Sequence, residues 1–206
     1  MKILSKLKKT PQRLRNIFST KKYIPEYVPE FKVEPINVIN VSTAWKGLEL
    51  IIPDILQRFN VDHGSCIEFG VEFGYSIVIF SNYFRHVVGI DTFDGDINTA
   101  NQNNHFDETR DRLARFNNIK LHKINYLDWI ATDDFLYDFA HVDIVHTHKD
   151  TYRCGLWAVQ NSKCAIFHDT ESFIDVRNAV IDIAKRTGKK VYNYPYHYGL
   201  GIIASE

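Results

Sequence analysis

The sequence predicts an α/β fold with a mostly parallel sheet and helices on both faces. Short apolar segments expected to form strands lie at 65–70, 86–91, 119–124, 138–143 and 163–168. Helical patterns separate them near 74–84, 105–116 and 152–160. Alternation of this kind is typical of a parallel sheet, because each helix returns the chain to the edge where the next strand begins. A helix near 174–187 then leads to two segments, 190–194 and 199–204, that are close enough to pair as an antiparallel hairpin and complete seven strands.

The chain divides at about residue 41 into an N-terminal region and one compact domain. Residues 1–41 comprise a basic segment and an extended connector with prolines at 25, 29 and 35, and residues 42–206 are long enough for a single core. Ser42 or Thr43 is expected to cap a helix that buries Trp45 and the aliphatic residues after it. Pro53 is expected to kink this helix.

Charge is distributed unevenly along a chain whose formal net charge is zero. Residues 1–22 hold eight of the 25 basic residues and no acid, which leaves 17 basic against 25 acidic residues, or 17 − 25 = −8, in the rest. That surplus of acid argues against a nucleic-acid substrate. The basic segment also carries apolar residues at helical spacing, so it could lie on the inner membrane surface, or pack on the domain or on a second subunit in a homo-oligomer.

Cysteine usage and hydropathy predict a cytoplasmic protein. Cys66, Cys154 and Cys164 are an odd number without C-x-x-C spacing, and two of them lie in apolar strand-like segments. We expect them to be reduced core residues. The sequence has no uninterrupted apolar run of about 18 residues and no apolar N-terminal signal.

The stretch Cys66–Ser76 predicts a nucleotide-like cofactor site. A strand leads into a turn with glycines at 70 and 74, and a helix follows whose first N–H groups would face an anion. Asp91 ends the next strand, about 20 residues later, where such folds bind a ribose. Because Glu72 occupies the position of the middle glycine in G-x-G-x-x-G, the spacing argues against NAD. Glycines that serve packing alone remain the alternative.

The pattern Glu68-x-Gly70-x-x-x-Gly74-x-Ser76 resembles the S-adenosylmethionine (SAM) motif of class I methyltransferases, which have a Rossmann-like fold, and is closest to the form in catechol O-methyltransferase. The resemblance implies that Glu68 accepts from the cofactor's amino group and that Ser76 and the helix N-terminus meet its carboxylate. Asp91 would bind the ribose. Glu72 departs from the tyrosine of the catechol enzymes, which leaves its contact open. The other cofactor-binding residues implied are Gly70, Gly74, Tyr75, Thr92, Asn125, Tyr126 and Asp143.

A second group of polar residues follows the fourth and fifth strands. Asp143 and His146 come after one, His168 and Asp169 end the other, and open sheets bind ligands along this edge. By resemblance to catechol O-methyltransferase, Asp143, His168 and Asp169 would hold a divalent metal, and His146 would be the base. A histidine ligand suits Mn, Fe or Zn better than Mg. Alternatively, the two acids cap turns and His168 is a core histidine.

From about Trp45 to Ile203 the chain also resembles small bacterial class I methyltransferases, many of which accompany surface-glycan genes. Ile144 and Val145 replace a glycine and an acid of their usual pattern. The resemblance implies O-methylation of a small hydroxylated acceptor such as a glycan sugar. A metal-dependent hydroxylase like the cephalosporin hydroxylases, and a non-catalytic SAM-binding module, are the other hypotheses.

Overall fold

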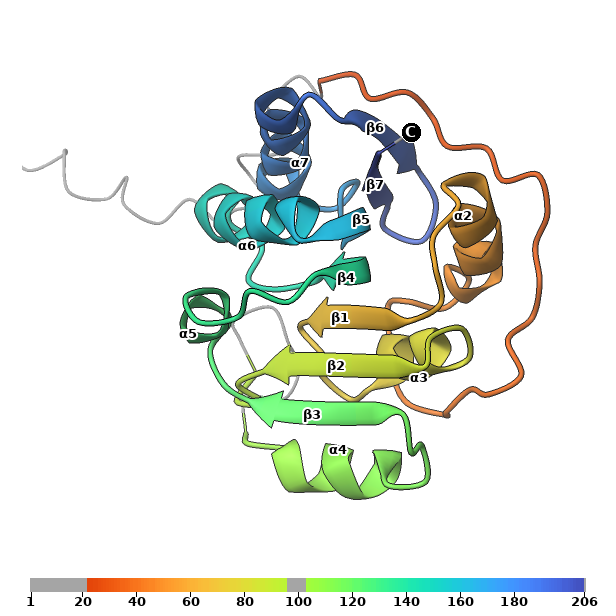
Figure 1. Ribbon diagram of the computed structural model, residues 1–206, viewed down its shortest axis with the longest axis vertical. Helices are drawn as coiled ribbons and strands as arrows, with labels where there is room; N and C mark the ends of the chain where they lie inside the picture. The colour runs from red at the N-terminus through yellow and green to blue at the C-terminus, as the bar shows by residue number, and fades with distance from the viewer. Residues whose placement is uncertain (1–21, 96–102, 206) are drawn as a thin grey trace, which may run out of the picture.

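A computed structural model describes residues 22–95 and 103–205 of the chain. Residues 1–21, which make up most of the basic segment, lie outside this range. The seven strands are β1 (Ser65–Phe69), β2 (His86–Asp91), β3 (Ile119–Lys123), β4 (Tyr137–Val142), β5 (Ser162–His168), β6 (Lys190–Tyr194) and β7 (Leu200–Ala204). They form one sheet in the order β3-β2-β1-β4-β5-β7-β6 (Figure 1).

The first five strands are parallel, and β7 runs antiparallel to both β5 and β6. The predicted α/β sheet with a C-terminal antiparallel hairpin is therefore confirmed. The order reverses between β1 and β4, and ligands bind at such a switch point in open α/β sheets.

Helices cover both faces of the sheet. They are the 3-10 helix η1 (Glu49–Ile51), α2 (Ile52–Arg58), α3 (Tyr75–Ser81), α4 (Phe106–Leu113), α5 (Tyr126–Ile130), α6 (His148–Gln160) and α7 (Ile174–Thr187). One core lies under α2, α3 and α4, and a second core lies under α5, α6 and α7. None of the described helices is long and apolar enough to cross a membrane.

Strand alternation decides which side chains enter which core. Cys66 and Phe139 point toward α2 and α3, whereas Ile67 and Ala140 point toward α6 and α7. All three cysteines are buried and free, as predicted.

The predicted start of the helix after Ser42 is wrong. Thr43 Oγ1 accepts from the Trp45 amide at 3.0 Å, which makes a local turn, and regular helix begins only at Glu49. Pro53 lies in the first turn of α2 and does not kink it, because the first turn needs no N–H from that residue. α5 was not predicted, and α6 begins four residues before its predicted start at 152.

The connector packs along the β6 edge of the sheet. The Tyr27 amide donates to the Asn193 carbonyl at 2.8 Å, and the Asn193 amide donates to the Pro25 carbonyl at 2.8 Å. Tyr27 is buried, and its hydroxyl donates to Asp54 of α2. Figure 1 shows the connector, in orange, passing around the outside of the body toward α3. Residues 22–41 are thus part of the folded unit.

Candidate functional site

The carboxyl ends of the parallel strands border a cavity of about 350 Å³. Its volume falls within the roughly 300–1,000 Å³ of typical ligand pockets. Ten of the predicted site residues line it: Gly70, Glu72, Asp91, Thr92, Asn125, Tyr126, Asp143, His146, His168 and Asp169. The structure therefore brings the predicted cofactor residues and the predicted catalytic residues to one cavity.

The turn after β1 is held in a conformation that favours glycine. Gly70 has φ +90°, and a Cβ there would lie 1.7 Å from the carbonyl oxygen of Asp143. Only a glycine lets the turn pass this close to the end of β4. Glu72 also has positive φ, at 48°. An L-residue adopts this left-handed conformation at a cost, which explains why glycine is usual at the position that Glu72 occupies.

Asp91 organises the same turn. Its Oδ2 accepts from the amides of Val71 at 2.8 Å and Glu72 at 2.9 Å, and its Oδ1 accepts from the Phe93 amide at 2.7 Å. A carboxylate has about four acceptor positions, so one remains for a hydroxyl in the cavity. Asp91 therefore joins the β1 turn to β2 while it faces the position expected for a ribose.

Four predicted cofactor residues, Glu68, Gly74, Tyr75 and Ser76, do not line the cavity. Glu68 is fully buried, and its Oε1 lies 2.7 Å from Nδ1 of His141, also fully buried. Burial raises the pKa of Glu68, although hydrogen bonds to His141 and Ser76 oppose that rise. The expected contact of Glu68 with the cofactor's amino group competes with a histidine of the neighbouring strand, and it stays a prediction. Ser76 is likewise turned toward Glu68.

Two carboxylates and two imidazoles meet at the other end of the cavity. His146 Nε2 lies 2.8 Å from Asp169 Oδ2 and 3.4 Å from Asp143 Oδ1. His168 Nδ1 lies 3.1 Å from Asp143 Oδ2 and 3.8 Å from Asp169 Oδ2. Asp169 has φ +67°, a left-handed conformation of a kind that clusters at functional sites.

The charges of this cluster depend on one another. Burial lowers the pKa of His146, but the hydrogen bonds to Asp143 and Asp169 outweigh it and raise the pKa to about 10. Burial acts in the same sense on His168, and Asp143 and Asp169 raise its pKa above the usual value. Burial raises the pKa of Asp143, whereas His168 and His146 lower it and prevail. At neutral pH, positive charge on His146 therefore offsets part of the negative charge of the two carboxylates.

The donor atoms suit a divalent cation. Asp143, His146 and Asp169 each offer one ligand atom, and these atoms all lie within 4.8 Å of one another. This group contains His146 in place of the predicted His168. His168 Nε2 lies 3.3 Å from the His197 carbonyl oxygen, and a metal-binding imidazole usually has such a hydrogen bond at its other nitrogen. Nδ1 of His168, on the side of Asp143, is therefore the nitrogen that could bind a cation.

The sequence did not predict that three residues just after the connector would line the cavity. Thr43, Ala44 and Trp45 line it, and the Trp45 ring centroid lies 5.0 Å from that of His141 and 6.2 Å from that of His168. Trp45 was predicted as a core residue of a helix. Nothing in its local sequence indicates that the connector brings it over the ends of β4 and β5.

Protein-family models gave no match to this chain, and neither did a sequence comparison with curated proteins. The O-methyltransferase NovP is similar in structure, with a TM-score of 0.59 at 13% identity, covering 74% of this chain and 76% of that one. The O-methyltransferase of Bacillus cereus, in complex with S-adenosylhomocysteine, gives 0.53 at 14% identity over 81% and 83%.

The O-methyltransferase TomG of Streptomyces achromogenes, in complex with SAM, gives a TM-score of 0.52 at 16% identity over 82% and 93% of the two chains. Together with the strand order, these similarities show that the chain has the Rossmann-like fold of class I SAM-dependent methyltransferases.

Proposed function

We propose that this protein is a SAM-dependent O-methyltransferase that acts on a small hydroxylated acceptor, a sugar of a surface glycan. One observation carries the proposal: a single cavity has Asp91 at the end of β2 and the cluster of Asp143, His146, His168 and Asp169 after β4 and β5. The first end suits a nucleoside, and the second suits an acceptor hydroxyl that must lose a proton.

Residues at the β1–β2 end would hold the cofactor. The free acceptor position of Asp91 suits a ribose hydroxyl, and Thr92 adds a second polar group beside it. Asn125 and Tyr126, after β3, line the same cavity and would contact the adenine. The Asn125 side chain accepts from the Leu127 amide at 2.9 Å, so it is held in place by the start of α5.

The other end would bind and deprotonate the acceptor. Asp143, Asp169 and Nδ1 of His168 are the residues that would hold a divalent cation such as Mn, which would leave Nε2 of His146 outside the ligand set. Such a cation would polarise the acceptor hydroxyl and lower its pKa. The proton transfer and methyl transfer described next do not depend on which cation binds.

His146 would take the proton. When His146 is the only positive charge beside Asp143 and Asp169, its pKa is about 10, so its ring is protonated at neutral pH. A protonated imidazole cannot act as a base. The role of base therefore requires other positive charge at these carboxylates. The acceptor oxygen would then form a bond to the methyl carbon as the bond from that carbon to sulfur breaks, and its proton would pass to Nε2 of His146.

Alignment is the protein's main contribution to this displacement. Holding the acceptor in near-attack geometry can contribute roughly 7–11 kcal/mol to lowering the barrier. Trp45 presents an apolar ring beside His168 and could support the face of a sugar ring. The cavity thus combines polar groups for hydroxyls with an aromatic wall, a combination that suits a carbohydrate.

Calorimetric titration with SAM tests the cofactor site. Wild-type protein should bind SAM with saturation, and Asp91→Asn should weaken binding at least about tenfold, since a hydrogen bond to a charged group contributes roughly 1.5–3 kcal/mol. Glu68→Gln is the matched control, because Glu68 lies outside the cavity, and it should leave the affinity unchanged. Absence of heat with wild-type protein would overturn the proposal.

Turnover tests the acceptor site. We expect His146→Ala to abolish methyl transfer to sugar acceptors while SAM binding persists, and chelation followed by added Mg or Mn to remove and restore activity. Full activity of His146→Ala would reject His146 as the base.

The two imidazoles of the cluster support a second candidate function. Two histidines and a carboxylate form the ligand set of non-haem iron oxygenases, so a metal-dependent hydroxylase on the same scaffold is the alternative. Activity that requires Fe and oxygen and proceeds without SAM would favour it.

A further inference from the structure

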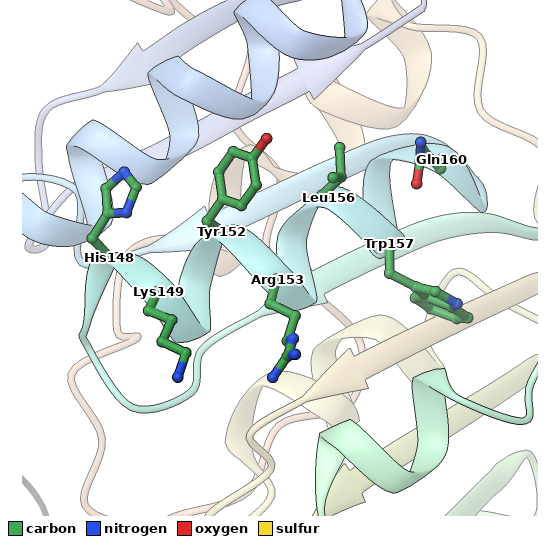
Figure 2. A pocket seen from close by; sticks show the side chains of 7 residues that line it. All are labelled: His148, Lys149, Tyr152, Arg153, Leu156, Trp157 and Gln160. Atoms are coloured by element: carbon green, nitrogen blue, oxygen red, sulfur yellow. The ribbon is translucent and has the colours of Figure 1, made fainter.

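The outer face of α6 carries a hollow of about 490 Å³ outside the site described above. Figure 2 shows that its seven side chains all project from this one helix. None of these seven side chains holds a buried nitrogen or oxygen that lacks a hydrogen-bond partner, so nothing in this hollow calls for a ligand. The cavity at the strand ends differs, because His105 in its wall holds such an atom.

His105 lines the cavity directly before α4, and no step proposed above uses it. The residue is only 5% exposed, and its Nε2 has no hydrogen-bond partner among the residues that the structure describes. The other ring nitrogen, Nδ1, lies 3.0 Å from the Asn103 carbonyl oxygen. A carbonyl oxygen can only accept, so Nδ1 carries the proton and the neutral ring presents Nε2 as an acceptor.

Two phenylalanines hold the imidazole ring of His105. Its centroid lies 5.0 Å from that of Phe73, in the turn after β1, and 5.8 Å from that of Phe93, just after β2. The His105 amide also donates to the Phe93 carbonyl at 3.0 Å, and the Phe93 amide donates to Asp91 at 2.7 Å. A single residue therefore links His105 to Asp91, which places the imidazole at the Asp91 end of the cavity.

The helix that follows His105 is fixed to the turn after β1. Thr109 Oγ1 donates to the Glu72 carbonyl at 3.2 Å. Three residues later, Arg112 donates to the Phe73 carbonyl at 3.1 Å. These contacts set the position of α4, and with it the position of His105, relative to the turn that borders the cavity.

A ribose requires more acceptors than Asp91 supplies. It has two neighbouring hydroxyl groups, and Asp91 has one acceptor position left. Thr92 is partly exposed, so its hydroxyl can form hydrogen bonds with water. Nε2 of His105 is shut off from water, and a hydroxyl in the cavity is the partner that it can gain.

We propose that His105 is a second ribose-binding residue, and that its Nε2 accepts a hydrogen bond from the ribose hydroxyl that Asp91 does not bind. The inference rests on the proposed function, since it takes SAM or its product as the ligand. The carboxylate of the cofactor could not replace the hydroxyl, because it would bring no proton to an acceptor nitrogen. Two acceptors on one diol would fix the orientation of the ribose, and through it the direction in which the sulfur presents the methyl group.

Calorimetric titration with S-adenosylhomocysteine tests the inference on wild-type protein, His105→Asn and His105→Gln. A glutamine side chain places a polar group near the position of Nε2, whereas an asparagine side chain places one only near the position of Nδ1. We expect His105→Asn to bind about five- to tenfold more weakly than wild-type protein, and His105→Gln to bind within about twofold of it. Unfolding curves of both variants verify the fold.

The 2′-deoxy and 3′-deoxy forms of S-adenosylhomocysteine separate a direct contact from a structural role. Wild-type protein should bind both forms more weakly than the parent compound. His105→Asn should bind one deoxy form as tightly as it binds the parent compound, because the contact with that hydroxyl is already lost. It should still bind the other form more weakly, since Asp91 serves that hydroxyl. A structural role of His105 would weaken all three ligands alike.

The outcomes distinguish this inference from the proposed function. Absence of S-adenosylhomocysteine binding by wild-type protein would overturn both. Binding by wild-type protein that His105→Asn leaves unchanged, or weakens equally for the parent compound and both deoxy forms, would overturn the role of His105 alone.

Discussion

The buried pair of Glu68 and His141 should stabilise the fold and not the cofactor. Both side chains are 0% exposed, and Oε1 lies 2.7 Å from Nδ1. The pair sits under α3, where the His141 ring lies 5.4 Å from that of Phe80 and 5.0 Å from that of Trp45. Removing one partner leaves the other polar group buried in apolar surroundings, at a cost of about 3–5 kcal/mol.

We therefore expect Glu68→Ala to lower the free energy of unfolding by about 3–5 kcal/mol. For a domain of this size, that corresponds to a fall in melting temperature of roughly 6–20 °C, at about 2–4 °C per kcal/mol. Urea titration followed by circular dichroism and tryptophan fluorescence measures both variant and wild-type protein. Glu68→Gln, which keeps an acceptor for the His141 ring, should cost only about 1 kcal/mol.

The double variant Glu68→Leu with His141→Phe separates the pair from its surroundings. Replacing both members of a buried hydrogen-bonded pair by apolar groups of similar shape can be nearly neutral, so this variant should be more stable than Glu68→Ala. The reasoning is refuted if Glu68→Ala unfolds within about 1 kcal/mol of wild-type protein. It is also refuted if Glu68→Gln loses SAM binding while its stability is unchanged.

Three further predictions concern the cavity and its rim. Gly70→Ala should lower the free energy of unfolding by more than about 2 kcal/mol, as measured by urea titration. The added Cβ would lie 1.7 Å from the Asp143 carbonyl oxygen, and residue 70 has φ +90°. A Gly70→Ala variant as stable as wild-type protein would contradict the turn geometry. Glu72→Gly should unfold at the same or slightly higher urea concentration, whereas Glu72→Val should lose about 1–2 kcal/mol at φ 48°. Burial raises the pKa of Asp150, but hydrogen bonds from Thr147 and Tyr126 outweigh burial and lower the pKa. The ionised Asp150 side chain therefore stabilises the fold at pH values above its unfolded pKa of about 3.9. This stabilisation is lost as the pH falls through the pKa that Asp150 has in the folded protein. Urea titrations at neutral and acid pH should therefore show Asp150→Asn less stable than wild-type protein only at neutral pH, and an equal difference at both would count against this pairing.

The positions of β1, β2, β4 and β5 were predictable because each is a short, largely apolar segment that ends at, or one residue before, a glycine or a polar residue. β2 and β6 have the predicted bounds, β4 is shifted by one residue, and each of the other strands differs by one residue at one end. Asp91, Asp143 and His168 were predictable as neighbours because each stands at or just after the carboxyl end of a parallel strand, and these ends share one edge.

The role of Glu68 was not predictable, because it depends on a contact with a residue 73 positions away. A motif identifies a residue type at a position but not the direction of its side chain. β1 and β4 are paired so that Glu68 faces His141, and strand alternation turns both toward α3 and away from the cavity. α5 was missed because its five residues are too few to show a period.

The connector links the two least predictable features of the site. Its hydrogen bonds with Asn193 and the contact of Tyr27 with Asp54 fix it to β6 and α2. From there it carries Trp45 across the ends of β4 and β5, where the ring contacts His141 below the cavity and His168 at its wall. Since Trp45 joins the buried pair to the acid and histidine cluster, substitutions that loosen the connector should disturb the acceptor end of the cavity before they disturb the Asp91 end.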